Sequence, residues 1–197
     1  METARPVEKT RTFIAVRIPE GVRRKLMEIE RELMGSGADV KWVSAENLHI
    51  TLKFIGPVEP NRVEAAARAV ESAVQGITAF EVHLAGVGAF PKVSRPSVVW
   101  VGTGRGGEEL KSLAERVESA CEREGFEREP RPFSPHITIG RVKSPKGLDA
   151  LAVGLERLRM AEAGSFPVEE VAVMKSELRP SGPVYSELAG FILAGSQ

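Results

Sequence analysis

The alternation of apolar and polar positions predicts that strands and helices follow one another along this chain. Residues 11–19 alternate as a strand does, and residues 20–37 carry apolar side chains at helical spacing before two closing glycines. The same reasoning extends to the later segments. Further strands are expected over 41–56, 80–91, 95–104, 134–142, 166–178 and 184–193, and further helices from Pro60 onward, over 108–125 and over about 146–160.

Two of these strands carry the same tripeptide, His-Ile-Thr. The copies occupy residues 49–51 and 136–138, and the chain has 3 histidines in all. Because residues two apart on a strand face the same way, each copy presents an imidazole and a hydroxyl together and turns its isoleucine into the core. Two such pairs facing each other would surround one small anion, as expected of a phosphoester site.

The order of elements around the two motifs is also repeated. Each half reads strand, helix, motif strand, helix, strand, with Phe13 lying 36 residues before His49 and Val98 lying 38 residues before His136. This spacing favours two lobes related by a pseudo-twofold axis, with repeats at about 11–94 and 95–193. We therefore expect one bilobal domain over 11–197, preceded by a flexible tail over 1–10, with a cleft between the lobes.

Composition narrows the class of protein. Lys+Arg and Asp+Glu both number 27, so strong non-specific nucleic-acid binding is not expected, although a local basic cleft can hold a short RNA end. The single Cys121 excludes an internal disulfide and a cysteine-based metal site. No apolar run has membrane-spanning length, and the first residues lack the apolar region of a signal peptide. A cytoplasmic protein without membrane association is the expectation.

Histidine and threonine suit phosphoryl chemistry. The unperturbed pKa of histidine is about 6.5, so one neutral and one protonated imidazole can serve as base and acid near neutral pH. Threonine hydroxyls can donate hydrogen bonds to non-bridging phosphoryl oxygens, where charge builds in the transition state. The two histidines and two threonines are the candidate catalytic residues, namely His49, His136, Thr51 and Thr138.

The motif regions KWVSAENLHITLKFIG and RPFSPHITIGRV resemble those of the two-histidine phosphoesterases, and within them the RNA 2′,3′-cyclic phosphodiesterases once called 2′-5′ RNA ligases. RTFIAVRIP and RPSVVWVG resemble the family's opening and mid-chain strands, so the resemblance covers nearly the whole chain. It implies an α+β fold with two pseudo-symmetric lobes, in which antiparallel sheets line a central cleft and helices lie outside.

The resemblance also implies a function. It implies metal-independent hydrolysis of RNA 2′,3′-cyclic phosphate ends to 2′-phosphomonoesters, with no cofactor. By analogy, His49 would protonate the departing 3′ oxygen, His136 would activate water, and Thr51 and Thr138 would hold the phosphate. The expected partners are RNA 3′ ends or small cyclic nucleotides. No obligate protein partner is expected, and a monomer is the expected state of a bilobal domain of this size.

Four further residues are candidates for substrate binding. Strand parity places Lys53 on the face of His49, whereas it places Arg141 on the face opposite His136. Arg141 therefore needs a bulge or twist at Gly140 to reach the site. The other two candidates are Arg131 and Phe133. Arg131 could contact phosphate or ribose, and the ring of Phe133 could stack on a base.

Three alternatives remain open at this stage. A zinc site formed by His49, His83 and His136 would conflict with the acid–base scheme, which needs both motif rings free, and His83 is expected at the surface. The same cleft could act on 2′-5′ linkages or run the ligation reaction, because substrate choice depends on cleft loops. A non-catalytic module that binds phosphorylated RNA ends is the third, and a pH–rate profile would distinguish it from an enzyme.

Overall fold

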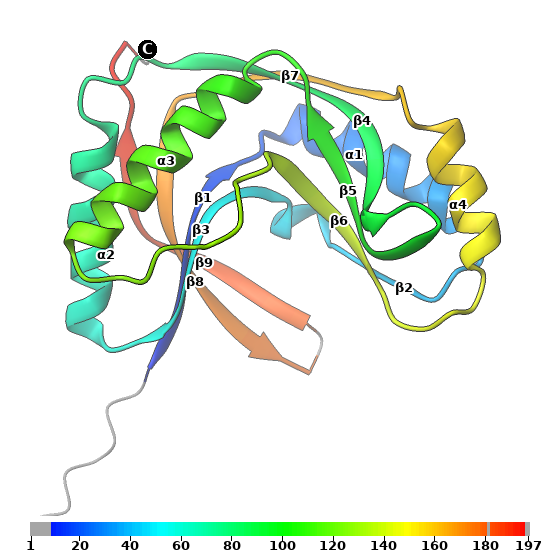
Figure 1. Cartoon of the computed structure of the whole chain (residues 1–197), viewed down its shortest axis with the longest axis horizontal. Coiled ribbons are helices and arrows are strands. Elements are labelled where there is room, and N and C mark those ends of the chain that lie inside the picture. Colours follow the sequence, from blue (N-terminus) through cyan, green and yellow to red (C-terminus); the bar gives the residue numbers. More distant parts are fainter. Residues whose placement is uncertain (1–8, 181, 196–197) are drawn as a thin grey trace, which may run out of the picture.

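The computed structural model describes residues 9–180 and 182–195, in which nine strands form one curled antiparallel sheet (Figure 1). Most of the expected tail over 1–10 lies outside the described residues, and Thr10 already belongs to the first strand. The elements in chain order are β1 (Thr10–Arg17), α1 (Glu20–Met34), β2 (Val40–Trp42), a 3-10 turn (Ala45–Asn47), β3 (His49–Val58), α2 (Pro60–Val74), β4 (Phe80–Lys92), β5 (Arg95–Thr103), α3 (Gly107–Arg123), β6 (His136–Val142), α4 (Leu148–Arg157), β7 (Glu162–Val168), β8 (Glu170–Arg179) and β9 (Gly182–Ile192).

The sheet has two halves that meet between β3 and β6. Its strand order is β7-β4-β5-β6-β3-β1-β8-β9, with β2 added beside β6. In the described part of the chain, β3 and β6 pair at one position, where Ile50 lies opposite Ile137. The expected pair of antiparallel sheets is therefore joined into one through this single ladder position.

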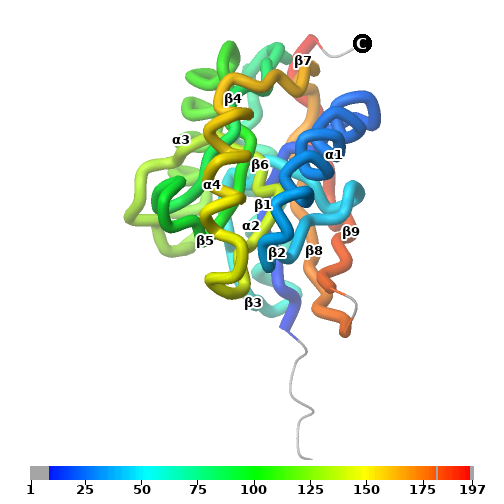
Figure 2. The backbone as a smooth tube through the Cα atoms, turned by 90° about the vertical axis from the view of Figure 1, so that its right-hand side faces the viewer, coloured from blue at the N-terminus to red at the C-terminus, as the bar shows by residue number. Residues whose placement is uncertain are grey.

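Helices cover the outside of both halves and leave the concave side open (Figure 1). α2 and α3 pack against β1, β3, β8 and β9, whereas α1 and α4 lie side by side against the half that contains β4, β5, β6 and β7 (Figure 2). This arrangement confirms the expected α+β architecture with helices outside. No helix among the described residues is long and apolar enough to cross a membrane.

The helical stripes predicted from the sequence are the faces that are buried. In α1, Val22, Leu26, Ile29 and Leu33 are all at most 7% exposed, and Gly35 follows the last turn. Burying one side chain of this size stabilises the fold by about 1.5–3 kcal/mol relative to leaving it in water. The spacing of apolar residues thus determines which side of each helix meets the sheet.

The chain crosses repeatedly between the two halves of the sheet. α1 follows β1 in sequence but packs near β6 and β7, and α3 follows β5 but packs against β3. Each half of the sheet is therefore built from segments of both sequence repeats. This crossing places a helix of the second repeat behind the strand that carries the first His-Ile-Thr motif.

The segment 166–178, predicted as one strand, belongs to two strands. β7 ends at Val168 and pairs with β4, whereas β8 begins at Glu170 and pairs with β1 and β9. Buried side chains occur at Phe166 and Val168 and then at the three consecutive residues 171–173, so the two-residue alternation ends at the boundary. The prediction was wrong because this break in the alternation, and not a turn motif, marks the passage between the sheet halves.

Candidate active site

The two His-Ile-Thr motifs lie on adjacent strands, β3 and β6. Ile50 and Ile137 face each other in the ladder, and both are 0% exposed. Because the strands are antiparallel, this register sets His49 across from Thr138 and His136 across from Thr51. The fold thus brings together the four side chains that the sequence singled out, on the face of the sheet that the helices leave open.

Both histidine rings are held by the same backbone contact. Nδ1 of His49 lies 2.7 Å from the carbonyl oxygen of Asn47, and Nδ1 of His136 lies 2.7 Å from that of Ser134. A carbonyl oxygen only accepts, so each Nδ1 carries a proton and donates it. The Nε2 atom of each ring is then the one available to give or take a proton.

The environment lowers the pKa of both imidazoles. Burial of the ring lowers the pKa of His49 below its ordinary value, and the charges of His136 and Arg141 lower it further, against the opposing effect of the Asn47 hydrogen bond. Burial likewise lowers the pKa of His136, with a smaller contribution from Arg141. At neutral pH and without substrate, both rings are therefore mainly uncharged.

Aromatic rings flank each histidine, and sequence reasoning did not select them as site residues. The centroids of Phe13 and Tyr185 lie 4.9 Å and 5.3 Å from that of His49, and Phe90 lies 5.0 Å from His136. Tyr185 and Phe90 come from β9 and β4, neither of which carries a motif. Only the order of strands in the sheet shows that they reach the site.

A β-bulge in β3 turns Lys53 away from the cleft. Consecutive residues of β1 pair with Thr51 and Lys53, so Leu52 is the extra residue of the bulge. Lys53 is 5% exposed, and its Nζ lies 2.5 Å from Oε1 of Glu118 on the helix side of the sheet. The prediction that Lys53 lines the cleft was wrong because strand parity fails across a bulge.

An equivalent bulge in β6 changes the face of the sheet to which Arg141 points. Consecutive residues of β5 pair with Thr138 and Gly140, which leaves Ile139 as the extra residue. Arg141 is exposed, and its charge contributes to the lowered pKa of both histidines. The bulge that Arg141 needed is therefore present beside Gly140, and the guanidinium lies on the side of the site.

The other two candidate binding residues lie in the segment that precedes β6. Arg131 has an 86% exposed side chain, and its Nε lies 2.8 Å from Oε1 of Glu129. Phe133 is half-buried and packs against the hydrophobic core. The location of these two side chains does not test whether they bind substrate, so the binding roles of Arg131 and Phe133 stay predictions.

His83 lies apart from the motif pair. It belongs to β4, and its Nε2 lies 3.8 Å from Oε2 of Glu162 on β7. Within residues 9–180 and 182–195, no group of three His, Cys, Asp or Glu side chains is placed to hold a metal ion. The structure therefore does not gather His49, His83 and His136 into one cluster.

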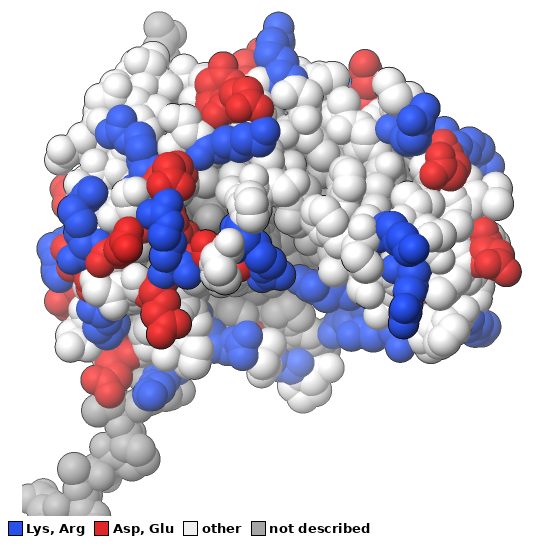
Figure 3. Space-filling view, viewed as in Figure 1, with Lys and Arg blue, Asp and Glu red and all other residues white. Residues whose placement is uncertain are grey.

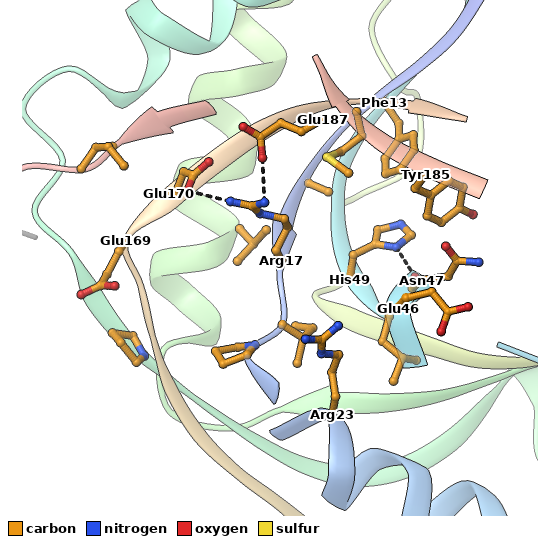
Figure 4. Close-up of a pocket in the computed structure, with 18 residues that line it drawn as sticks. Phe13, Arg17, Arg23, Glu46, Asn47, His49, Glu169, Glu170, Tyr185 and Glu187 are labelled. Carbon is orange, nitrogen blue, oxygen red and sulfur yellow. Dashed lines mark hydrogen bonds and ion pairs between the residues drawn. The ribbon is translucent and has the colours of Figure 1, made fainter. Parts of the chain in front are cut away.

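A cavity of about 780 Å³ opens beside His49. Figure 4 shows His49 and Tyr185 at one side of it and Arg17 in its middle, where the guanidinium lies 2.9 Å from Glu170 and 2.7 Å from Glu187. On the face seen in Figure 3, Lys and Arg side chains border the central hollow. This cavity includes His49 but not His136, and both arginines and glutamates line it.

Comparison with known proteins agrees with this geometry. Residues 20–180 match the sequence profile of the 2′-5′ RNA ligase superfamily. An RNA 2′,3′-cyclic phosphodiesterase of Methanothermobacter thermautotrophicus is 37% identical over 185 residues, which cover 94% of this chain and 100% of that protein.

Solved structures agree as well. TT0787 of Thermus thermophilus has a TM-score of 0.79 at 30% identity, over 95% of this chain and 100% of that one. E. coli LigT complexed with 3′-AMP has a TM-score of 0.76 at 25% identity, over 95% and 99%. Because the profile and the relatives span most of the sequence, this chain belongs to the 2′-5′ RNA ligase superfamily.

Proposed function

We propose that this protein is an RNA 2′,3′-cyclic phosphodiesterase that converts the cyclic phosphate at an RNA 3′ end to a 2′-phosphomonoester. The observation that carries the proposal is the pair of imidazoles on adjacent strands, each with Nδ1 tied to a backbone carbonyl. Relatives that bear this enzyme name over nearly the whole chain support it, as does the similarity to LigT complexed with a nucleotide.

In the proposed reaction, water attacks phosphorus opposite the bond to the 3′ oxygen. Nε2 of His136 takes a proton from the water as the new P–O bond forms. Nε2 of His49 gives a proton to the 3′ oxygen as the P–O3′ bond breaks. Phosphorus keeps its bond to the 2′ oxygen, so the product is a 2′-phosphate, and solvent restores the starting protonation of both rings.

The remaining groups stabilise the charge that develops on the non-bridging oxygens. Thr138 lies directly across the ladder from His49 and Thr51 directly across from His136, and the Arg141 guanidinium adds a positive charge. Removing one donor of this kind from an enzyme typically costs about 2.7–4 kcal/mol of transition-state stabilisation. The two threonines and the arginine therefore have a measurable role in this scheme.

The test is incubation of the purified protein, with EDTA present, with a short RNA that ends in a 2′,3′-cyclic phosphate. The product end is compared with 2′-phosphate and 3′-phosphate standards by chromatography and mass. Conversion to the 2′-phosphate is expected. His49→Ala and His136→Ala should each lower kcat by about 10²–10⁴-fold with an unchanged circular dichroism spectrum.

Three results would overturn the proposal. Binding of the cyclic end without turnover, by a folded wild-type protein, would identify a capture module. Full activity in both histidine variants would remove the acid–base mechanism. Joining of RNA ends in place of hydrolysis would instead assign the ligation reaction to the same site.

We also propose that the working form is a cytoplasmic monomer. All the side chains placed at the site come from one chain, so no second copy is needed to complete it. Light scattering coupled to size exclusion at the assay concentration tests the oligomeric state, and fractionation of the source cells tests the location.

A further inference from the structure

Lys53 and Glu118 form a buried ion pair between the first motif strand and α3. The lysine is 5% exposed and the glutamate 9%, with Nζ and Oε1 2.5 Å apart. Burying opposite charges stabilises a fold little unless further hydrogen bonds satisfy them. The contacts around this pair therefore indicate what it does.

The further hydrogen bonds of Lys53 and Glu118 are made with the backbone of a single segment. Nζ of Lys53 donates to the carbonyl oxygen of Glu127 at 2.8 Å, and Oε1 of Glu118 accepts from the backbone N–H of Glu129 at 3.0 Å. Both backbone groups belong to residues 124–135, the stretch without helix or strand that joins α3 to β6. The pair thus fastens this stretch to the strand that carries His49.

The same stretch leads directly into the second motif. Its Ser134 supplies the carbonyl oxygen that receives the Nδ1 proton of His136, and His136 is the first residue of β6. The position of this stretch therefore affects the position of the His136 imidazole. Lys53 lies two residues after Thr51. Its ion pair therefore connects the first motif strand to the stretch before the second motif, on the side of the sheet that the helices cover.

The sheet itself provides little to set the distance between the motifs. In the described part of the chain, β3 and β6 share one ladder position, Ile50 opposite Ile137. One ladder pair by itself does not define the angle between the two strands. Contacts outside the ladder that lie close to the motifs therefore contribute to the separation of their histidines.

We propose that Lys53 and Glu118 are positioning residues that couple the first motif strand to the approach of the second motif and so set the spacing of His49 and His136. This inference rests on the proposed function for its kinetic readout. Neither residue contacts the cleft, so both act through the histidines. Because Cys121 and Glu118 lie on the same buried side of α3, the pair can be replaced by apolar side chains without opening that side to water.

The experiment uses the double variant Lys53→Met/Glu118→Leu. Replacing both partners by apolar groups avoids leaving one buried charge unpaired, which would unfold the protein for a trivial reason. The variant should keep the wild-type circular dichroism spectrum and a cooperative melt. On the cyclic-phosphate RNA, kcat should fall at least about tenfold while KM changes less than about threefold, because misplacement affects chemistry more than binding.

A matched control removes a pair that ties the same stretch to α3 at the surface. Arg128 bonds Glu115 there, with side chains 42% and 62% exposed. The double variant Arg128→Met/Glu115→Leu should keep kcat within about twofold, since exposed pairs contribute little. Lys53→Arg, which retains a cation for Glu118 and the Glu127 carbonyl, should recover most of the activity that the apolar pair loses.

A readout that needs no turnover separates this inference from the proposed function. Proton NMR can follow the titration of His49 and His136 in the wild type and in the variant. In Lys53→Met/Glu118→Leu, the pKa of His49 and His136 should rise toward the ordinary value as the rings separate and water enters. A folded variant with wild-type titration of His49 and His136, or with wild-type kcat, would overturn the coupling.

Discussion

Phe54 and Arg141 occupy corresponding positions in the two motif strands, each two residues after the extra residue of the bulge that follows the His-Ile-Thr motif. Phe54 is 68% exposed, and its ring centroid lies 6.4 Å from that of Phe13, which itself contacts His49. The bulges turn both side chains to the motif face of the sheet. At this position one strand therefore offers an aromatic surface and the other a positive charge.

Phe54 is expected to stack on a base of the RNA substrate. Most of the Phe54 ring is exposed beside the site and is therefore open to a base, and stacking of one base on an aromatic side chain contributes about 1–3 kcal/mol. Phe54→Ala should raise KM for the cyclic-phosphate RNA by about 5- to 100-fold, with a smaller change in kcat. Steady-state kinetics measures this.

The control for Phe54 is Met160→Ala, which removes a 77% exposed apolar side chain just beyond α4. Both substitutions should leave the free energy of unfolding within about 0.5 kcal/mol of wild type, because exposed positions away from special contacts tolerate change. An unchanged KM in Phe54→Ala would show that the ring is not part of the binding surface.

The pH dependence of kcat/KM should be displaced to the acid side. This quantity reports the free enzyme, in which burial and neighbouring charge lower the pKa of both His49 and His136. The base must be neutral and the acid protonated, so the maximum should lie below about pH 6.5, the ordinary histidine pKa. A rate profile across pH 4–9 at constant ionic strength, about 0.15 M, checks this.

Arg141→Gln should move that profile to higher pH. Its charge lowers the pKa of both rings, so removing the charge lets both values rise. The lost contact to phosphate should also lower kcat/KM about 10- to 100-fold. Arg157→Gln, which removes a 63% exposed side chain paired with Glu32, is the control and should leave the profile in place. An unmoved profile in Arg141→Gln would contradict the electrostatic role.

Gly140 is expected to be irreplaceable at the β6 bulge. A Cβ atom there would lie 2.7 Å from Cγ1 of Val40 and 2.9 Å from Cε3 of Trp42. Gly140→Ala should cost about 1–3 kcal/mol of unfolding free energy in urea titrations and lower activity through Arg141. Gly21→Ala in α1 meets nothing within 4 Å and should be neutral or stabilising, so equal losses in both variants would refute this packing argument.

Glu30 should make stability depend on pH. It is 2% exposed, its Oε2 has no hydrogen-bond partner among the described residues, and burial raises its pKa to about 7. Between pH 4.5 and 7 the folded state binds more protons than the unfolded state, so stability falls as pH rises through this window. Glu30→Gln should therefore stabilise the protein by up to about 3 kcal/mol at pH 8.

The comparison at low pH completes the Glu30 test. At pH 4 the wild-type carboxyl is mainly protonated in both states, so the Glu30→Gln variant and the wild type should unfold at nearly the same urea concentration. A gain of equal size at pH 4 and pH 8 would mean that the substitution acts through packing and not through the ionised carboxylate.

Local sequence determined the elements and the chemistry of the site. The helical stripe of α1 and the alternation around each His-Ile-Thr motif depend only on residues near one another in the chain, and the structure buries the sides they predict. The repeated motif also identified His49 and His136, because two imidazoles in the same local context are rare in a chain with 3 histidines. These features can be predicted from sequence because apolar residues repeat with the period of the helix or strand that contains them.

Tertiary structure alone decided which other side chains meet those histidines. Lys53 and Arg141 exchanged their expected sides because bulges in β3 and β6 break the two-residue alternation, and a bulge is set by pairing with the neighbouring strand. Tyr185 and Phe90 reach the rings through the order of strands in the sheet. The sequence determined what each strand carries, whereas contacts between distant segments determined which way it faces, since register is a property of two strands and not of one.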